Sequence, residues 1–340
     1  MSTRIWYNRT FSTASHYVEM IRNNSDNEKF EIYATHPKRH SLMLQVADYA
    51  ELEPKLPKEE YARYCLDFCR KHQIDIFVPH FGLLEISRHA DQFEEIGTKV
   101  MLGGDEALLN VVSDKGTLFE ELKSVDGLIL PDYFVVNTAS QFEESYRELK
   151  EKGKKVCFKP VCGEGGAGFR IIDDQIKDVK CLFQSVTPHV HLEDVMRMLS
   201  SVDQFESLMV MELLNGYEYS VDCLGTGEQL LAVVPRKKVE GRVRALESNE
   251  ALIELAHAIH KKLPLQYNFN IQFIYQGDTP KLLEINPRTS GGLYTSCLSG
   301  INYPYLAVKL LLGQEVVVPD PNLDILATHI EKEVLINQLL

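Results

Sequence analysis

Two short apolar segments between residues 270 and 288 carry polar side chains at alternating positions. Gln272 lies in the first segment, and Glu284, Asn286 and Arg288 lie in the second. Because alternate side chains of a strand point to the same face, we expect the last three to share one face. Carboxylate and amide oxygens beside a guanidinium suit a hard divalent cation that carries a polyphosphate. A sheet with one solvated face has the same pattern, so this segment alone leaves both interpretations open.

A glycine-rich turn follows the apolar run that ends at Lys159 and Pro160. A buried ammonium needs a counter-charge, which a nucleotide phosphate would supply to Lys159. Successive backbone N–H groups of a glycine-rich turn form a concavity that binds anions. A tight hairpin is the alternative interpretation of the turn, whose residues are Gly163, Glu164, Gly165, Gly166, Ala167 and Gly168.

Two further segments carry charge. The run from Glu212 to Asp222 places acidic residues on both sides of Asn215-Gly216, which is also what a turn between strands with surface acids looks like. The run from Pro235 to Arg244 holds five positive charges. Its residue Arg236 is a candidate for gripping phosphate or an acceptor carboxylate, because arginine binds such groups with two hydrogen bonds. A solvated basic hairpin is the other interpretation.

The order of these segments resembles that of the ATP-grasp superfamily. Asp114-Lys115 comes first, then the strand ending in Lys159-Pro160, the glycine turn, the acidic hinge, the glutamine strand and the Glu-x-Asn-x-Arg run. The most similar branch is the one related to the large subunit of carbamoyl phosphate synthetase. The resemblance covers about residues 110–312, and the preceding residues resemble the α/β domain that precedes the grasp fold in this family.

The resemblance implies roles in nucleotide binding. Lys115 and Lys159 would hold the α- and β-phosphates. The glycine turn would be a mobile flap over the triphosphate. Glu212 would accept a hydrogen bond from the adenine amino group, the backbone of Leu213 and Leu214 would form the hinge contact, and Glu218 would bind the ribose hydroxyls.

The resemblance also implies a metal set and a catalytic set. Gln272, Glu284 and Asn286 would hold one or two Mg²⁺ ions, for which Mn²⁺ is an alternative. Because this set has a single carboxylate, we expect metal binding to depend on the charge of ATP. The catalytic residues would be Arg288, Lys159 and Arg236, with Arg288 meeting the γ-phosphate as it transfers.

The implied activity is that of an ATP- and magnesium-dependent ligase. It would activate a small carboxylate as an acyl phosphate for attack by an amine or another nucleophile, releasing ADP and phosphate. The expected partners are therefore small carboxylates and amines, and a homodimer is also expected. Two alternatives stay open: a kinase of the same fold that leaves phosphate on a small acceptor, and a non-catalytic ATP-binding regulatory module.

Predicted strands and helices alternate in the N-terminal part of the chain. Strands at Arg4–Tyr7, Phe30–Ala34 and Ile74–Val78 alternate with helices near 13–23 and 56–71, which predicts a parallel sheet covered on both faces. We therefore predict an α/β and α+β chain with an N-terminal α/β domain over 1–112. A lid subdomain over 113–213 and a C-terminal subdomain with the metal and phosphate site over 214–340 would complete the fold.

The ends of parallel strands point to an acceptor site. The loop Asn8–Ser15 and the segment Pro79–Gly82 each follow a predicted strand. Crevices at the carboxyl ends of such strands are favoured ligand positions. His80 is therefore a candidate for the acceptor pocket, although a histidine after a strand is often an ordinary loop residue.

Composition limits the classes of partner. The chain has 340 residues and a net charge of −13, which argues against general affinity for nucleic acid or anionic membranes. No apolar run approaches the length of a membrane span, and the first residues do not have the pattern of a signal peptide. Seven cysteines without a close Cys-x-x-Cys pair fit reduced thiols. A cytoplasmic location is expected.

Overall fold

A computed structural model describes residues 2–163, 165–176, 183 and 185–336. The chain divides into two compact units that are not contiguous in sequence. The first unit contains residues 1–110, 218–272 and 285–340, and the second contains residues 111–217 and 273–284. The predicted domain limits at 112 and 213 stay predictions. A further division of the first unit stays a prediction.

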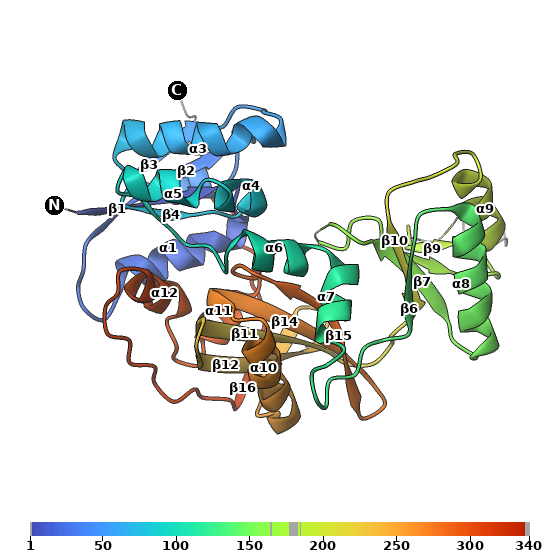
Figure 1. Ribbon diagram of the computed structural model, residues 1–340. Helices are drawn as coiled ribbons and strands as arrows, with labels where there is room; N and C mark the ends of the chain where they lie inside the picture. Colours follow the sequence, from blue (N-terminus) through green and yellow to red (C-terminus); the bar gives the residue numbers. More distant parts are fainter. Residues whose placement is uncertain (1, 164, 177–182, 184, 337–340) are drawn as a thin grey trace. The chain divides into compact units, whose positions relative to one another are not determined.

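The N-terminal part of the first unit is a five-stranded parallel sheet with the order β3-β2-β1-β4-β5. Its centre is apolar: Trp6 is fully buried and stacks on Phe77 and Phe68 with ring centroids 4.1 and 4.3 Å apart. Figure 1 shows α3 and α5 on one face of this sheet and α1 on the other. The strands are β1 (Thr3–Asn8), β2 (Phe30–His36), β3 (Tyr49–Leu52), β4 (Ile76–Val78) and β5 (Lys99–Val100), and the helices are α1 (Ser15–Arg22), α2 (Met43–Val46), α3 (Lys58–His72), α4 (Leu83–Ser87) and α5 (Ala90–Glu95). The predicted covered parallel sheet is confirmed.

The second sheet of the chain has the order β15-β14-β11-β12-β13-β16. The pairs β11–β12, β12–β13 and β13–β16 are antiparallel. Strands β14 and β15 are adjacent in this sheet and continue from the first unit into residues 273–284 of the second. The elements are β11 (Glu218–Thr226), β12 (Leu230–Glu240), β13 (Val243–Leu246), α10 (Glu250–Lys262), β14 (Gln266–Gln276), β15 (Thr279–Asn286), α11 (Leu293–Cys297), α12 (Tyr303–Leu311) and β16 (Ile325–Ala327).

The second unit is built on a sheet with the order β6-β10-β7-β8-β9. Strand β10 pairs antiparallel with β6 and β7, and β7 pairs antiparallel with β8. Helices α8 and α9 pack on this sheet (Figure 1), and Phe142 of α8 is fully buried in the core. The elements are α7 (Lys115–Leu122), β6 (Tyr133–Val136), α8 (Ala139–Glu151), β7 (Val156–Pro160), β8 (Arg170–Ile172), β9 (His189–Val190), α9 (Leu192–Leu199) and β10 (Leu208–Glu212); α6 (Glu106–Ser113) precedes them. Within the described ranges, no helix has both the length and the apolar character needed to cross a membrane.

Candidate functional site: a lysine cluster and a buried arginine network

Two lysines and a glutamate come together in the second unit. Asp114 caps α7 by accepting a hydrogen bond from the Thr117 amide, so Lys115 begins the helix. The Lys115 ammonium donates to the Gly163 carbonyl at 2.9 Å and lies 4.0 Å from a carboxylate oxygen of Glu284. The structure thus brings Lys115 and Glu284, which are distant in sequence, to one place.

Lys159 belongs to the same cluster and is nearly buried. Lys159 lies near the end of β7 and is 9% exposed. Its ammonium donates to the Leu283 carbonyl at 3.4 Å. Burial, reinforced by the Lys115 ammonium, lowers the pKa of Lys159 to about 8, against the opposing effect of Glu284. Two ammonium groups that share one carboxylate form a local positive centre in an acidic protein. Such a centre favours a polyanion such as a polyphosphate.

The glycine turn connects β7 to β8 in a hairpin. The glycines of the turn have positive φ angles: 149° at Gly163, 64° at Gly165, 71° at Gly166 and 75° at Gly168. An added Cβ at Gly165 or Gly166 would meet no atom within 4 Å, so glycine is needed there for its backbone conformation and not for space. Glu164, predicted as part of the same turn, lies outside the described residues. Closure of the turn over a ligand stays a prediction.

Glu212 ends β10 and is almost fully buried. Its carboxylate accepts hydrogen bonds from Lys154 at 2.8 Å, from the Asp132 amide at 3.0 Å and from Lys281. Burial raises its pKa, but the hydrogen bonds from Lys154 and Lys281 outweigh burial and hold the pKa below its usual value. Glu212 is therefore ionised and already paired within the second unit.

The residues that follow Glu212 are placed differently. Leu213 donates its amide to the Lys155 carbonyl at 2.7 Å. Leu214 is buried. Glu218 begins β11 in the first unit and accepts a hydrogen bond from Lys238 at 3.2 Å. The nucleotide roles of these residues stay predictions.

The predicted metal ligands lie on the adjacent strands β14 and β15. Glu284 and Asn286 are partly exposed, whereas Ile285 between them is 3% exposed, as strand alternation requires. Gln272 is partly exposed between the buried residues Ile271 and Phe273. Gln272 and Asn286 belong to the first unit and Glu284 to the second. The donor set of one carboxylate and two amide oxygens fits Mg²⁺, which prefers oxygen ligands and keeps waters or phosphate oxygens in its shell.

Arg236 lies in a buried network of the first unit. Its Nε and Nη2 donate to Asp222 Oδ2 at 3.2 and 3.1 Å, and its side chain also reaches Ser290 and Ser296 at 3.4 and 3.3 Å. Asp222 is fully buried and also accepts from Asn270 at 2.8 Å. A buried charge pair needs such additional hydrogen bonds to offset its desolvation. The Arg236 guanidinium already donates two hydrogen bonds to Asp222. An acceptor carboxylate or phosphate would therefore bind Arg236 in addition to Asp222, as the sequence predicts.

Gly292 is the close neighbour of this network. A Cβ built on Gly292 would lie 2.6 Å from Nη1 of Arg236. The guanidinium is pinned by Asp222 and cannot move away without losing those hydrogen bonds. The absence of a side chain at Gly292 thus leaves room for the Arg236 guanidinium. In the same loop, the Ser290 hydroxyl contacts both Asp222, at 2.9 Å, and Arg236.

A second group of residues in the first unit lies around Arg288. Its guanidinium lies 5.2 Å from the ring centroid of Phe11, and the Phe11 ring packs edge-on against His80 at 4.6 Å. His80 Nε2 is 3.4 Å from the Thr289 hydroxyl. Burial, helped by the Arg288 charge, lowers the pKa of His80 to about 3, so the imidazole is neutral. His80 Nδ1 is buried and has no hydrogen-bond partner among the described residues.

Asp222 lies in the acidic run and Phe11 in the candidate loop of the sequence analysis, but the contacts of neither residue were predicted. Asp222 lies in an apolar strand between the buried residues Val221 and Cys223, and a carboxylate in such a position is a signal of a paired charge. Phe11 carried no signal, because an aromatic residue in a loop is unremarkable until the fold places it under Arg288.

A family model described as ATP-grasp in the biosynthetic pathway with Ter operon matches residues 204–333. The carbamoyl phosphate synthase large chain of Clostridium acetobutylicum is 22% identical over 269 residues, which is 75% of this chain and 24% of the relative. The arginine-specific large chain of Bacillus subtilis is 24% identical over 292 residues, 82% of this chain and 26% of the relative. The chain therefore spans about a quarter of the length of these curated relatives.

Solved structures show the same fold. The ADP complex of N5-carboxyaminoimidazole ribonucleotide synthetase matches with a TM-score of 0.69 at 14% identity, over 95% of this chain and 79% of the other. The biotin carboxylase domain dimer of Hydrogenobacter thermophilus 2-oxoglutarate carboxylase, in complex with MgADP, ADP and bicarbonate, matches with a TM-score of 0.66 at 17% identity. That match covers 93% of this chain and 71% of the other.

Proposed function

We propose that this chain is a member of the ATP-grasp superfamily, in a branch similar to the large chain of carbamoyl phosphate synthase, and that it acts as an ATP- and magnesium-dependent ligase. It activates a carboxylate as an acyl phosphate and joins it to an amine, with release of ADP and phosphate. The observation that carries this proposal is the cluster of Lys115, Lys159 and Glu284, with two cations against one carboxylate.

We assign the triphosphate of ATP to this cluster. Lys115 and Lys159 hold the α- and β-phosphates, which add negative charge where two ammonium groups lie beside the single carboxylate of Glu284. The glycine turn covers the triphosphate with its backbone N–H groups. Phosphate oxygens approach more closely where no side chains intervene, which suits the open space at Gly165 and Gly166.

The adenosine moiety is assigned to the hinge after β10. Glu212 accepts from the adenine amino group in addition to its lysine partners, because a carboxylate offers about four lone-pair sites. The carbonyl of Leu213 and the backbone of Leu214 complete the hinge contact. Glu218 accepts hydrogen bonds from the ribose hydroxyls, which replace the hydrogen bond that it accepts from Lys238.

Gln272, Glu284 and Asn286 are proposed to hold Mg²⁺ together with the phosphate oxygens. When bound, the metal neutralises charge on the phosphates and orients them. With one protein carboxylate in the set, most of the negative charge around the metal comes from ATP.

The chemistry then follows from the weakness of a carboxylate as an electrophile. An oxygen of the acceptor carboxylate attacks the γ-phosphorus, the bond from that phosphorus to the β–γ bridging oxygen breaks, and ADP leaves. The amine attacks the acyl carbon, the bond to the phosphate oxygen breaks, and phosphate leaves with the amine proton passing to solvent. Arg288 neutralises the charge on the γ-phosphoryl group as it transfers, which is the main protein contribution in phosphoryl transfer.

The test is an Arg288→Ala variant assayed with hydroxylamine, which traps acyl phosphates as hydroxamates. A panel of amino acids, hydroxy acids and dipeptides is incubated with Mg²⁺ and ATP. We expect the wild-type protein to form ADP and a hydroxamate from at least one acid, and Arg288→Ala to be slower by about a hundredfold or more with ATP affinity retained. Arg70→Ala, which removes a guanidinium from an exposed pair with Asp67, is the control.

Two results count against the proposal. Equal hydroxamate formation by the wild-type and Arg288→Ala proteins would remove Arg288 from the reaction. ADP formation with phosphate retained stably on the acceptor would identify a kinase of the same fold.

A further inference from the structure

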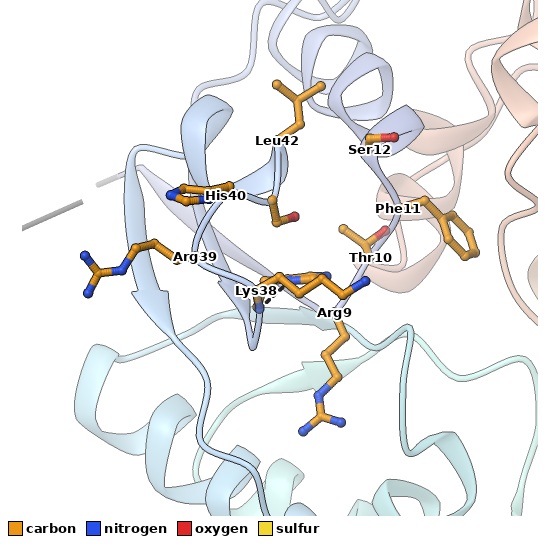
Figure 2. Close-up of a pocket in the computed structure, with 10 residues that line it drawn as sticks. Arg9, Thr10, Phe11, Ser12, Lys38, Arg39, His40 and Leu42 are labelled. Carbon is orange, nitrogen blue, oxygen red and sulfur yellow. Dashed lines mark hydrogen bonds between the residues drawn. The ribbon is translucent and has the colours of Figure 1, made fainter. Parts of the chain in front are cut away.

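A cavity of about 630 Å³ lies in the first unit where the parallel strands β1 and β2 end. Two loops line it: Arg9–Ser12 after β1, and Lys38–Leu42 after His36, the last residue of β2 (Figure 2). Because both strands run parallel, the loops after them leave from the same edge of the sheet. The residues that line the cavity belong to the first unit, whereas Lys115, Lys159 and Glu284 belong to the second.

The lining of this cavity is cationic in an acidic protein. None of its ten described lining residues is acidic, whereas Arg9, Lys38 and Arg39 carry positive charge and two more are histidines. Two of these cations point elsewhere. The Arg9 guanidinium pairs with Glu53 at 3.1 Å, and the Arg39 side chain extends away from the cavity in Figure 2. Lys38 is therefore the cation that serves the cavity.

The backbone of Lys38 is held in place by its own loop. Its amide donates to His36 Nδ1 at 3.0 Å, and its carbonyl accepts from the Ser41 amide at 3.0 Å. Burial lowers the pKa of His36, which keeps that imidazole neutral and able to accept this hydrogen bond. Figure 2 shows the Lys38 side chain running across the cavity toward Thr10. The loop thus directs one ammonium toward the end of β1.

Hydroxyl groups complete the lining. Thr10, Ser12 and Ser41 all line the cavity. Thr10 is 3% exposed, and its hydroxyl has no hydrogen-bond partner among the described residues. Buried hydroxyls are nearly always hydrogen-bonded, so a group without a partner beside a cavity indicates a missing ligand or water. An anion near Lys38 gives the Thr10 hydroxyl an acceptor.

Phe11 connects this cavity to the reaction site. It lines the cavity, and its ring also contacts the Arg288 guanidinium and His80. A molecule with one end in the cavity and the other beside Arg288 therefore passes along Phe11. Both ends lie within the first unit.

We propose that the cavity binds a second anionic group, a phosphate or a carboxylate, on the acceptor whose carboxylate the enzyme activates. This inference rests on the proposed function and names its substrate class: an acid with at least two anionic groups. Lys38 supplies the charge, and the hydroxyls of Thr10, Ser12 and Ser41 supply hydrogen bonds. Phosphate and carboxylate share this chemistry, so the test includes both.

The test is a calorimetric titration of the full chain with inorganic phosphate and, separately, with acetate. Lys38→Ala is compared with Arg39→Ala, which removes a cation from the same turn that points away from the cavity. We expect Lys38→Ala to weaken binding of the preferred anion about tenfold, the size expected for a charge-assisted hydrogen bond. Arg39→Ala is expected to stay within about twofold, since the Arg39 side chain extends away from the cavity (Figure 2). The titration that reaches saturation, with phosphate or with acetate, identifies the preferred anion.

A third variant separates this cavity from the ATP site. Lys159→Gln weakens any anion binding at the lysine cluster, and the Lys38-dependent binding is expected to remain. Equal binding by the wild-type and Lys38→Ala proteins, or no binding of either anion to the wild type, overturns the inference. If Arg288→Ala forms hydroxamate like the wild type while Lys38-dependent binding persists, the proposed ligase fails and the anion site stands.

Discussion

The lowered pKa of Lys159 is the property of a single residue that most directly indicates a ligand. Its ammonium is buried beside a second ammonium, and both effects lower its pKa to about 8 from the ordinary value of 10.5. Because the unfolded chain keeps the ordinary value, this group destabilises the fold below about pH 8, and the penalty disappears as the pH rises toward 10.5. A buried group that destabilises its own protein is a candidate for ligand binding.

Phosphate binding reverses this pKa shift. A polyphosphate beside Lys159 favours the protonated form, so ATP binding at pH 8.5 is accompanied by proton uptake. Calorimetry of ATP binding in two buffers of different ionisation enthalpy measures that uptake. We expect uptake by the wild-type protein and much less by Lys159→Gln. Equal uptake by both would mean that Lys159 does not face the phosphates.

The burial of Lys159 could be predicted from the sequence, whereas the ion pair of Arg236 could not. The position of Lys159 at the end of an apolar strand was enough to predict a buried cation that needs a partner. The partner of Arg236 was not predictable. Asp222 lies opposite Val234 in the antiparallel register, and Arg236 lies opposite Ser220, so the pair is diagonal across two strands. A diagonal contact depends on a register that a single sequence does not state.

Elements with strong local signals were predicted well from the sequence. The strand predicted at Phe30–Ala34 is the first part of β2 (Phe30–His36), and the helix predicted near 56–71 is α3 (Lys58–His72). The strand β16 and its pairing with β13 were not predicted. A three-residue strand of which every residue is partly exposed or exposed has no periodicity long enough to detect, and its pairing comes from the fold.

Gly216 tests the connection between β10 and β11. An added Cβ at Gly216 would lie 1.8 Å from the Tyr275 carbonyl oxygen, and a backbone atom cannot rotate away. The adjacent Tyr217 carbonyl accepts from the Tyr275 amide at 2.8 Å, so moving the segment breaks that hydrogen bond. We expect Gly216→Ala to lower the free energy of unfolding by about 2 kcal/mol or more, measured by urea denaturation.

Gly291 provides the control for that substitution. A Cβ there would meet other atoms only at 4.0 Å, and the stability of Gly291→Ala is expected to stay within about 0.5 kcal/mol of the wild type. Unfolding of Gly216→Ala at the same urea concentration as the wild type would contradict the close approach of these two segments.

At the scale of the whole molecule, the chain order does not follow the compact units. Residues 1–110 share a unit with residues 218–272 and 285–340, and residues 273–284 return to the second unit. Local patterns predicted the N-terminal parallel sheet, but long-range grouping depends on contacts between segments that are far apart in sequence. The Glu-x-Asn-x-Arg run was recognised by resemblance, whereas its division between the units came from the structure.

The metal set gives a prediction for the complete protein. One carboxylate and two neutral amides should bind Mg²⁺ too weakly to saturate at about millimolar metal, until nucleotide adds its charge. Calorimetric titration of Mg²⁺ into the protein, with and without ADP, measures the difference. We expect binding with ADP that Glu284→Gln weakens. Tight metal binding by the nucleotide-free protein would contradict the assignment of Gln272, Glu284 and Asn286.

The most direct test is the affinity for Mg·ATP of Lys159→Gln compared with Lys152→Gln. Lys152 is an exposed lysine of the same unit that pairs with Glu148 at 2.9 Å, so its loss changes net charge equally without touching the cluster. We expect Lys159→Gln to weaken Mg·ATP binding about tenfold or more, and Lys152→Gln to match the wild type. If Lys159→Gln bound Mg·ATP as tightly as the wild type, the lysine cluster would not be where the triphosphate lies.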